Sequence, residues 1–166
     1  VLVILAVYGW HRYYLVYLYM KNKDKMPVPA GPMAALPAVT VQLPIYNEMY
    51  VADRLIDAVC KLDYPRELLE IQVLDDSTDE TRGVAEQAVR RNAAKGVDIT
   101  YLHRTDRTGY KAGALEAGMK AAKGEFIAIF DADFIPPVDF LQRLMPHFCD
   151  DKIGMVYRNA EGETVK

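Results

Sequence analysis

Short apolar runs alternate with segments of helical periodicity from residue 39 onward, and this alternation limits the possible folds more than any other feature of the chain. The apolar runs span residues 39–44, 70–76, 98–102, 125–133 and 153–157. Strands that alternate with helices favour a parallel sheet with right-handed crossovers. Near-continuous apolar runs are typical of strands covered on both faces. We therefore expect an α/β fold with a largely parallel sheet.

Polar residues at the strand ends predict where a site would lie, because ligands of such sheets bind beyond the carboxyl ends of the strands. The first expected strand leads into "PIYNE" (44–48), the second into "DDSTDE" (75–80), and the fourth ends in "DADF" (131–134). The segment "HRTDRTGYKAGALEAG" (103–118) adds basic residues and glycines. We expect these four segments to form one site.

Asp131 and Asp133 are the candidate metal ligands. Residues two apart on a strand point to the same side, so the pair would place two carboxylates together. Their repulsion is relieved by a divalent cation that prefers oxygen ligands, and we expect Mg²⁺ or Mn²⁺. The alternative is a pair of solvated loop carboxylates at a turn before Pro136.

Lys111 is the candidate ligand for an anion. It lies between Gly109 and Gly113 in "GYKAG", at the head of a segment with helical character (112–122). A helix N-terminus and an ammonium group both favour anionic oxygens. Together with the aspartate pair, this indicates a metal-bound diphosphate. The alternative is an ordinary surface lysine.

Asp75 and Asp76 end a different expected strand from the metal pair. Either could take part in metal binding or accept a hydrogen bond from the N–H of a nucleotide base, and Tyr46 could offer a stacking surface. The alternative is a helix cap by Ser77, Thr78 or Asp79. We expect both roles to occur, divided among different residues.

The first 25 residues predict a membrane or interfacial helix. "VLVILAVYGWHRYYLVYLYM" is apolar and aromatic, with Trp10 and several tyrosines suited to a membrane interface, and Lys21, Lys23 and Lys25 follow on the expected cytoplasmic side. Its uninterrupted apolar part, 1–10, is half of the roughly 20 residues that a spanning helix needs. A buried helix of a soluble domain is the alternative. Residues 26–38, with four prolines, predict a linker, and 39–166 the domain.

Charge and cysteines narrow the class of protein further. A net charge of −3 does not favour nucleic acid as a partner. Cys60 and Cys149 show no zinc-binding spacing, and we expect both to be reduced thiols.

Four blocks, in this order, resemble the family 2 glycosyltransferases of the membrane-bound type that includes cellulose synthases and glucomannan synthases. They are "LPIYNE", "QVLDDSTDET", "DRTGYKAGAL" and "IAIFDADFIPPVDFL". The resemblance covers roughly residues 39–157. It implies a GT-A nucleotide-sugar fold and an inverting transfer from a donor of the UDP-glucose or GDP-mannose class to a glycan or other acceptor.

The resemblance also implies residue roles. Asp131 and Asp133 would hold the metal. Asp76, with or without Asp75, would contact the base, beside Tyr46 and Glu48 of the first block. Lys111 would approach the diphosphate, where it and the metal stabilise the charge of the leaving group.

The acceptor side of the family pattern is absent from this sequence. Neither a "TED"-like motif with its general base nor a "QxxRW" motif occurs, and "IGMVY" continues as "RNAEGETVK". With Val1 first and Lys166 last, we expect a truncated chain whose general base lies beyond Lys166. The 166 residues would then bind donor weakly at most and transfer no sugar, an expectation that a measured turnover would contradict.

Two other functions fit parts of the pattern. A haloacid-dehalogenase-type phosphatase also carries D-x-D after an apolar strand, and covalent phosphate capture on Asp131 would favour it. A membrane-tethered nucleotide-binding module without catalysis would bind donor and never transfer it.

Overall fold

The structure is a computed structural model that describes residues 2–22, 29, 31, 33–158 and 164–165. The chain divides into two compact units, Pro32–Pro146 on the one hand and Val1–Gly31 with His147–Lys166 on the other. The predicted linker, 26–38, falls partly on residues outside those described.

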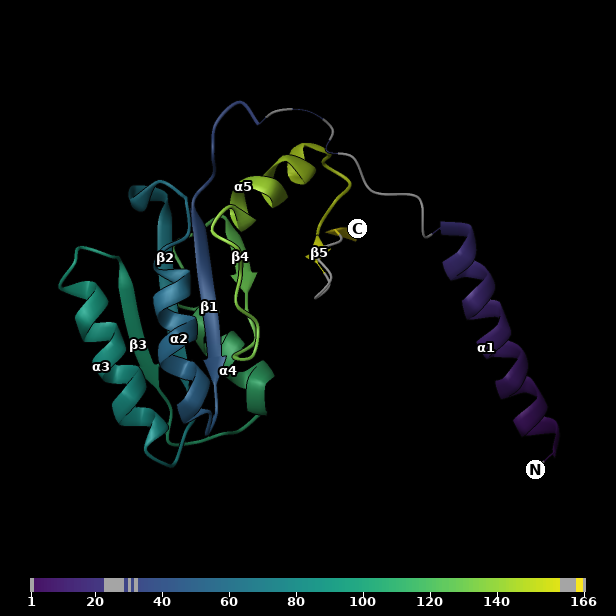
Figure 1. Cartoon of the computed structure of the whole chain (residues 1–166), viewed down its shortest axis with the longest axis horizontal. Coiled ribbons are helices and arrows are strands. Elements are labelled where there is room, and N and C mark those ends of the chain that lie inside the picture. The colour runs from purple at the N-terminus through teal and green to yellow at the C-terminus, as the bar shows by residue number, and fades with distance from the viewer. Residues whose placement is uncertain (1, 23–28, 30, 32, 159–163, 166) are drawn as a thin grey trace. The chain divides into compact units, whose positions relative to one another are not determined.

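Unit Pro32–Pro146 is built on a parallel sheet, as predicted, and this sheet has four strands (Figure 1). Its strands are β1 (Val39–Ile45), β2 (Leu69–Asp75), β3 (Ile99–His103) and β4 (Phe126–Ile129), in the spatial order β3-β2-β1-β4. Because the order reverses direction between β1 and β4, the carboxyl ends of these two strands flank the switch point where such sheets bind ligands.

Helices cover both faces of this sheet. They are α2 (Met49–Val59), α3 (Thr81–Ala93) and α4 (Tyr110–Met119), with the short α5 (Phe140–Leu144) after β4. Figure 1 shows α2 and α3 packed side by side over one face and α4 over the other. β1 and β2 are buried along nearly their whole length, which explains their uninterrupted apolar sequence.

Alternation along the strands assigns each side chain to a face. Gly118 of α4 packs against Gln42 and Gln72, so the even-numbered residues of β1 and β2 face α4. Ile71, Val73 and Asp75 therefore point to the opposite face, which α3 covers.

The second half of the chain departs from the predicted strand boundaries. The expected strand 125–133 ends early, because β4 stops at Ile129 and Asp131 begins a turn in which its carbonyl accepts a hydrogen bond from the Phe134 N–H at 3.0 Å. The fifth strand predicted at 153–157 is wrong: 153–156 form no strand, and only β5 (Tyr157–Arg158) pairs, antiparallel, with β6 (Thr164–Val165).

Short 3₁₀ turns complete the described elements, η1 (Arg66–Leu68) before β2 and η2 (Met145–Cys149) after α5. The start of α3 follows its sequence signals, since Asp79 Oδ1 accepts a hydrogen bond from the Thr81 N–H at 3.0 Å. Gly96, just beyond the end of this helix, has a positive φ of 81°.

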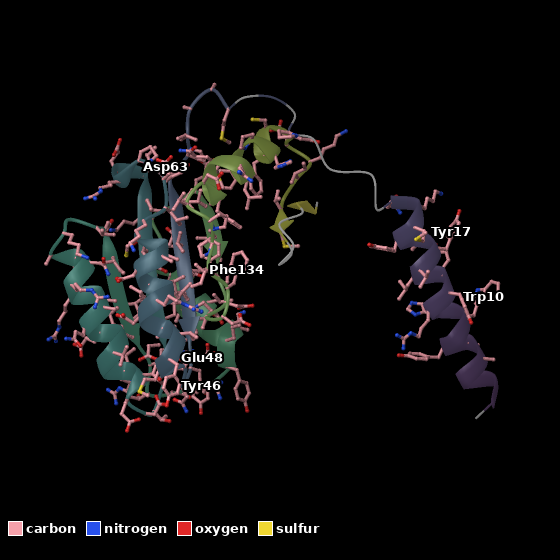
Figure 2. All side chains as sticks on the ribbon, in the orientation of Figure 1. Trp10, Tyr17, Tyr46, Glu48, Asp63 and Phe134 are labelled. Atoms are coloured by element: carbon pink, nitrogen blue, oxygen red, sulfur yellow. The ribbon has the colours of Figure 1, made fainter. Side chains whose placement is uncertain are left out.

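The N-terminal segment forms one helix, α1 (Leu2–Asn22). From Val7 to Met20 it exposes large apolar and aromatic side chains, among them Trp10 and Tyr17 (Figure 2). No helix in the described part of the chain combines the length and apolarity needed to cross a bilayer.

Candidate donor-binding site

A cavity of about 530 Å³ opens at the carboxyl edge of the sheet. Six of the seven candidate site residues line it, and they come from four separate segments: Tyr46, Glu48, Asp76, Lys111, Asp131 and Asp133. Figure 2 shows Tyr46 and Glu48 at this end of the sheet and Asp63 at the other. Because parallel strands all end at this edge, residues far apart in sequence meet here.

The remaining candidate, Asp75, is not among the residues that line the cavity. Its side chain is fully buried and accepts hydrogen bonds from the Tyr101 hydroxyl at 2.5 Å and the Ser77 N–H at 2.9 Å. Burial, followed by the hydrogen bond to Asp75, raises the pKa of Tyr101, so the phenol stays protonated and keeps donating. Asp75 thus orders the end of β2, and a direct contact with the nucleotide remains a prediction without support from this geometry.

Asp76 reaches the cavity, and its carboxylate is paired with the side chain of Arg104. The Arg104 guanidinium donates to both carboxylate oxygens, from Nε at 2.8 Å and from Nη2 at 2.6 Å. Asp76 is 5% exposed, and such a buried charge needs a partner of this kind. Arg104 therefore neutralises and orients the carboxylate.

Lys111 is placed by the glycines that flank it. Gly109 has a φ of 76°, and a Cβ on Gly113 would lie 2.1 Å from the Thr108 carbonyl oxygen. Only glycine permits this close return of the loop onto the first turn of α4. The predicted helix starts and ends two to three residues early, at Tyr110 and Met119, and Lys111 remains in its first turn. Its Nζ forms an ion pair with Asp131.

Asp131 and Asp133 lie in the turn after β4, so the prediction that strand alternation places them on one side is wrong. The turn brings both to the cavity instead. Phe130 and Phe134, on either side of the pair, stack with ring centroids 5.9 Å apart. Both pack edge-on against Phe140, at 5.0 and 6.0 Å, and this aromatic cluster fixes the turn.

The electrostatics of the cavity favour a bound cation. Partial burial, then the negative charges of Asp133 and Asp131, raise the pKa of Glu48, while Lys111 lowers it. Three carboxylates thus act on one another across the cavity. A divalent cation would relieve this repulsion.

The residues present fit a metal that is shared with a substrate. Within the described residues no three His, Cys, Asp or Glu side chains are arranged to hold an ion by themselves. Asp131 and Asp133 would supply two carboxylates, which is the usual way that proteins hold Mg²⁺ together with substrate phosphates.

Arg107 is a cavity residue that the sequence reasoning did not single out. Its guanidinium carbon lies 3.3 Å from the centroid of the Tyr46 ring and 5.0 Å from that of Tyr110. It therefore covers the aromatic surface proposed for a base. The signal was available: Arg104 and Arg107 lie in the basic segment 103–118, opposite the acidic strand ends.

Comparisons with known proteins agree with this geometry. The sequence pattern of the family described as Glycosyl transferase family 2 matches residues 40–164. Glucomannan 4-beta-mannosyltransferase 9 of Arabidopsis thaliana is 48% identical over 128 residues, which cover 74% of this chain and 24% of the relative. Glucomannan 4-beta-mannosyltransferase 1 of Oryza sativa subsp. japonica is 50% identical over 120 residues, 68% of this chain and 22% of the relative.

Solved structures show the same fold. The mannosyltransferase PcManGT of Pyrobaculum calidifontis, in complex with GDP-Man and Mn²⁺, superimposes with a TM-score of 0.74 at 31% identity, over 95% of this chain and 46% of that chain. TarS 1-349 of S. aureus, in complex with UDP-GlcNAc, gives a TM-score of 0.56 at 25% identity, over 64% of this chain and 29% of that chain.

The predicted GT-A-like α/β fold is confirmed by these structures. The chain spans about a quarter of the length of the curated relatives it matches. The family match also decides against the phosphatase alternative. By its pattern over residues 40–164 and by its fold, the chain belongs to glycosyltransferase family 2.

Proposed function

We propose that this chain is the donor-binding part of an inverting glycosyltransferase that moves a sugar from a nucleoside diphosphate sugar to a glycan, in mannan- or glucan-type synthesis. One observation carries the proposal: Asp76, Lys111 and Asp133, from three separate segments, line the same cavity. The relatives named as glucomannan mannosyltransferases support the class of product.

The proposed roles follow from chemistry at each position. Arg107 lies over the Tyr46 ring, so it has to move aside for the base to stack on that surface. Asp76, oriented by Arg104, accepts from a base N–H. Lys111 lies near the helix N-terminus and binds diphosphate oxygens. A divalent ion held by Asp131 and Asp133 stabilises the negative charge of the leaving diphosphate.

GDP-mannose is the donor that we propose in preference to UDP-glucose, with Mn²⁺ or Mg²⁺ as the metal. Support comes from the relatives' names and from the neighbour solved with GDP-Man and Mn²⁺.

Calorimetric titration of the chain with GDP-mannose and with UDP-glucose, each with and without Mn²⁺, tests the proposal. We expect binding that requires Mn²⁺ and weakens about tenfold or more in Asp133→Asn, since one of the two metal carboxylates is lost. Asp63→Asn, the same change in an exposed loop at the opposite end of the sheet, is the matched control. Equal affinity without metal and without the Asp133 carboxylate would overturn the assignment.

We propose a membrane location for the whole protein, with this domain on the cytoplasmic side and α1 at the membrane surface. The exposed aromatic side chains of α1 and Lys21 near its end support an interfacial position. Trp10 is the chain's single tryptophan, so its fluorescence reports on α1 alone. A blue shift with anionic vesicles is expected, and an unchanged spectrum would contradict the location.

A further inference from the structure

The loops that follow β1 and β2 are joined beyond the ends of the strands through one residue, Asn47, which uses both its side chain and its backbone N–H. The Thr78 N–H donates to Asn47 Oδ1 at 2.9 Å, and the Asn47 N–H donates to Ser77 Oγ at 2.9 Å. A weaker contact of 3.4 Å joins Asn47 Nδ2 to Thr78 Oγ1. These bonds continue the pairing of the two strands after the backbone ladder ends, where the Asp76 N–H donates to the Ile45 carbonyl at 3.0 Å.

Asn47 adopts a backbone conformation that few residues tolerate. Its φ is 53°, in the left-handed region where asparagine is enriched and most side chains are strained. It lies in a bend between Tyr46 and Glu48, both of which line the cavity. Asn47 itself is not among the residues that line the cavity.

Ser77, the partner of Asn47 in this contact, is itself held by hydrogen bonds. Ser77 is 1% exposed, and its N–H donates to Asp75 Oδ1 at 2.9 Å. Asp75 in turn is held by Tyr101. Ser77 is therefore held in place by buried hydrogen bonds. Its contact with Asn47 in turn restrains the loop that carries Tyr46 and Glu48.

We propose that Asn47 is a positioning residue for donor binding, which locks the Tyr46–Glu48 loop to the Asp76–Thr78 loop and so sets the spacing between the base-contacting and the metal-facing walls of the cavity. This rests on the proposed function, because the walls are assigned to base and metal there. The role is separate from the contacts that Tyr46 and Asp76 make themselves, since Asn47 acts through them.

Two substitutions separate the parts of this contact. Asn47→Gly keeps the left-handed backbone without strain and removes only the side chain. Ser77→Ala removes the acceptor for the Asn47 N–H. If the two bonds form one unit, the double variant loses little more than either single variant, because coupled residues are not additive. Asn47→Asp keeps the oxygen that accepts from Thr78 and serves as the conservative rescue.

The first readout is hydrogen exchange of the Thr78 amide, followed by NMR on the whole chain. We expect faster exchange in Asn47→Gly and protection restored in Asn47→Asp. The second readout is the Kd for GDP plus Mn²⁺ and for UDP plus Mn²⁺, which we expect to weaken roughly tenfold in Asn47→Gly, since misplaced site residues lose much of their effect. The melting temperature should move by no more than about 3 °C.

Asp63→Gly, a change to glycine in an exposed loop at the other end of the sheet, should leave both readouts unchanged. Unaltered exchange and affinity in Asn47→Gly would overturn the positioning role, and so would a loss of affinity no larger than that of Asp63→Gly. If the unmodified chain binds neither nucleotide, the proposed function fails. In that case hydrogen exchange of the Thr78 amide still tests the Asn47 contact. Unchanged protection of this amide in Asn47→Gly would contradict the contact.

Discussion

Lys111 forms an ion pair with Asp131 in the cavity at the carboxyl edge of the sheet, although the two residues are twenty positions apart in the chain. The side chains are 52% and 61% exposed, so the pair contributes only about 0–1 kcal/mol to stability. Its importance lies in the site, since the same carboxylate is a candidate metal ligand and the same ammonium a candidate diphosphate ligand.

Lys111→Met should therefore weaken nucleotide binding far more than it changes stability. We expect about a tenfold higher Kd for GDP plus Mn²⁺, because one cation facing the diphosphate is lost. Calorimetry measures the Kd, and urea denaturation the free energy of unfolding. Lys120→Met, at the end of the same helix with a 75% exposed side chain, should bind like the unmodified chain. Equal losses in both variants would point to a nonspecific effect of charge.

The aromatic cluster packs around the turn that carries Asp131 and Asp133, so weakening this cluster should lower both the stability of the protein and its affinity for a metal ion. Phe134→Ala removes two ring contacts, to Phe130 and Phe140, and should lower the free energy of unfolding by about 2 kcal/mol. The turn that carries Asp131 and Asp133 should also loosen. Phe134→Leu should be intermediate in both. Paramagnetic line broadening measures the Mn²⁺ affinity of each variant. A constant affinity across the series would show that the cluster does not order the turn.

Gly118 predicts a packing defect under α4. A Cβ at this position would lie 2.6 Å from Gln42 Nε2 and 2.9 Å from Gln72 Oε1, both on fully buried side chains. Gly118→Ala should lower the free energy of unfolding by about 1–3 kcal/mol through overpacking. Gly83→Ala is the matched control, because nothing lies within 4 Å of its added methyl, and it should stabilise α3 by about 0.5–1 kcal/mol. Thermal unfolding of both variants compares them, and the same sign of change in the two would contradict the packing argument.

Cys60 predicts a difference in thiol reactivity and a pH effect. Burial, and then the charge of Asp57, raises the pKa of the Cys60 thiol to about 11, whereas Cys149 is exposed. Iodoacetamide at pH 8 should therefore modify Cys149 first, as peptide mass spectrometry would show.

The same shift fixes the sign of a stability change. The pKa of the Cys60 thiol in the folded protein lies above its ordinary value of 9.0, so unfolding releases a proton between about pH 9 and 11. The free energy of unfolding therefore falls as the pH rises through this window. Other groups titrate there too, so the comparison is with Cys60→Ala, whose decline should be shallower. Parallel declines in the two proteins would contradict the assignment.

Much of the fold could be read from the sequence. The apolar runs marked all four parallel strands, because strands covered on both faces must be apolar throughout. The carboxyl-edge rule then predicts that Tyr46, Asp76, Lys111 and Asp133 lie together, and all four line one cavity. The strands and the meeting of these residues at one edge are predictable because they depend on local periodicity and on a property shared by all parallel sheets.

Other features depended on contacts between distant residues. Nothing in "DDS" says which aspartate faces the cavity, because both faces of the sheet are covered and the choice follows from the packing of α3 and α4. Arg104 meets Asp76 across 28 positions, and Asn47 meets Thr78 across 31. The turn at Asp131 likewise depends on Phe140, which packs against the rings on either side of it.

The pattern of apolar and polar residues along the chain was enough to predict the four parallel strands, the helices between them and the edge of the sheet at which the cavity lies. Packing between distant segments determines that Asp75 is a buried support, that Arg104 holds Asp76, that Arg107 lines the cavity and that Asn47 joins the two loops. The physical reason is that hydrogen bonds and ion pairs are short-ranged, so their partners are fixed only when packing brings the strand ends within about 3 Å of one another.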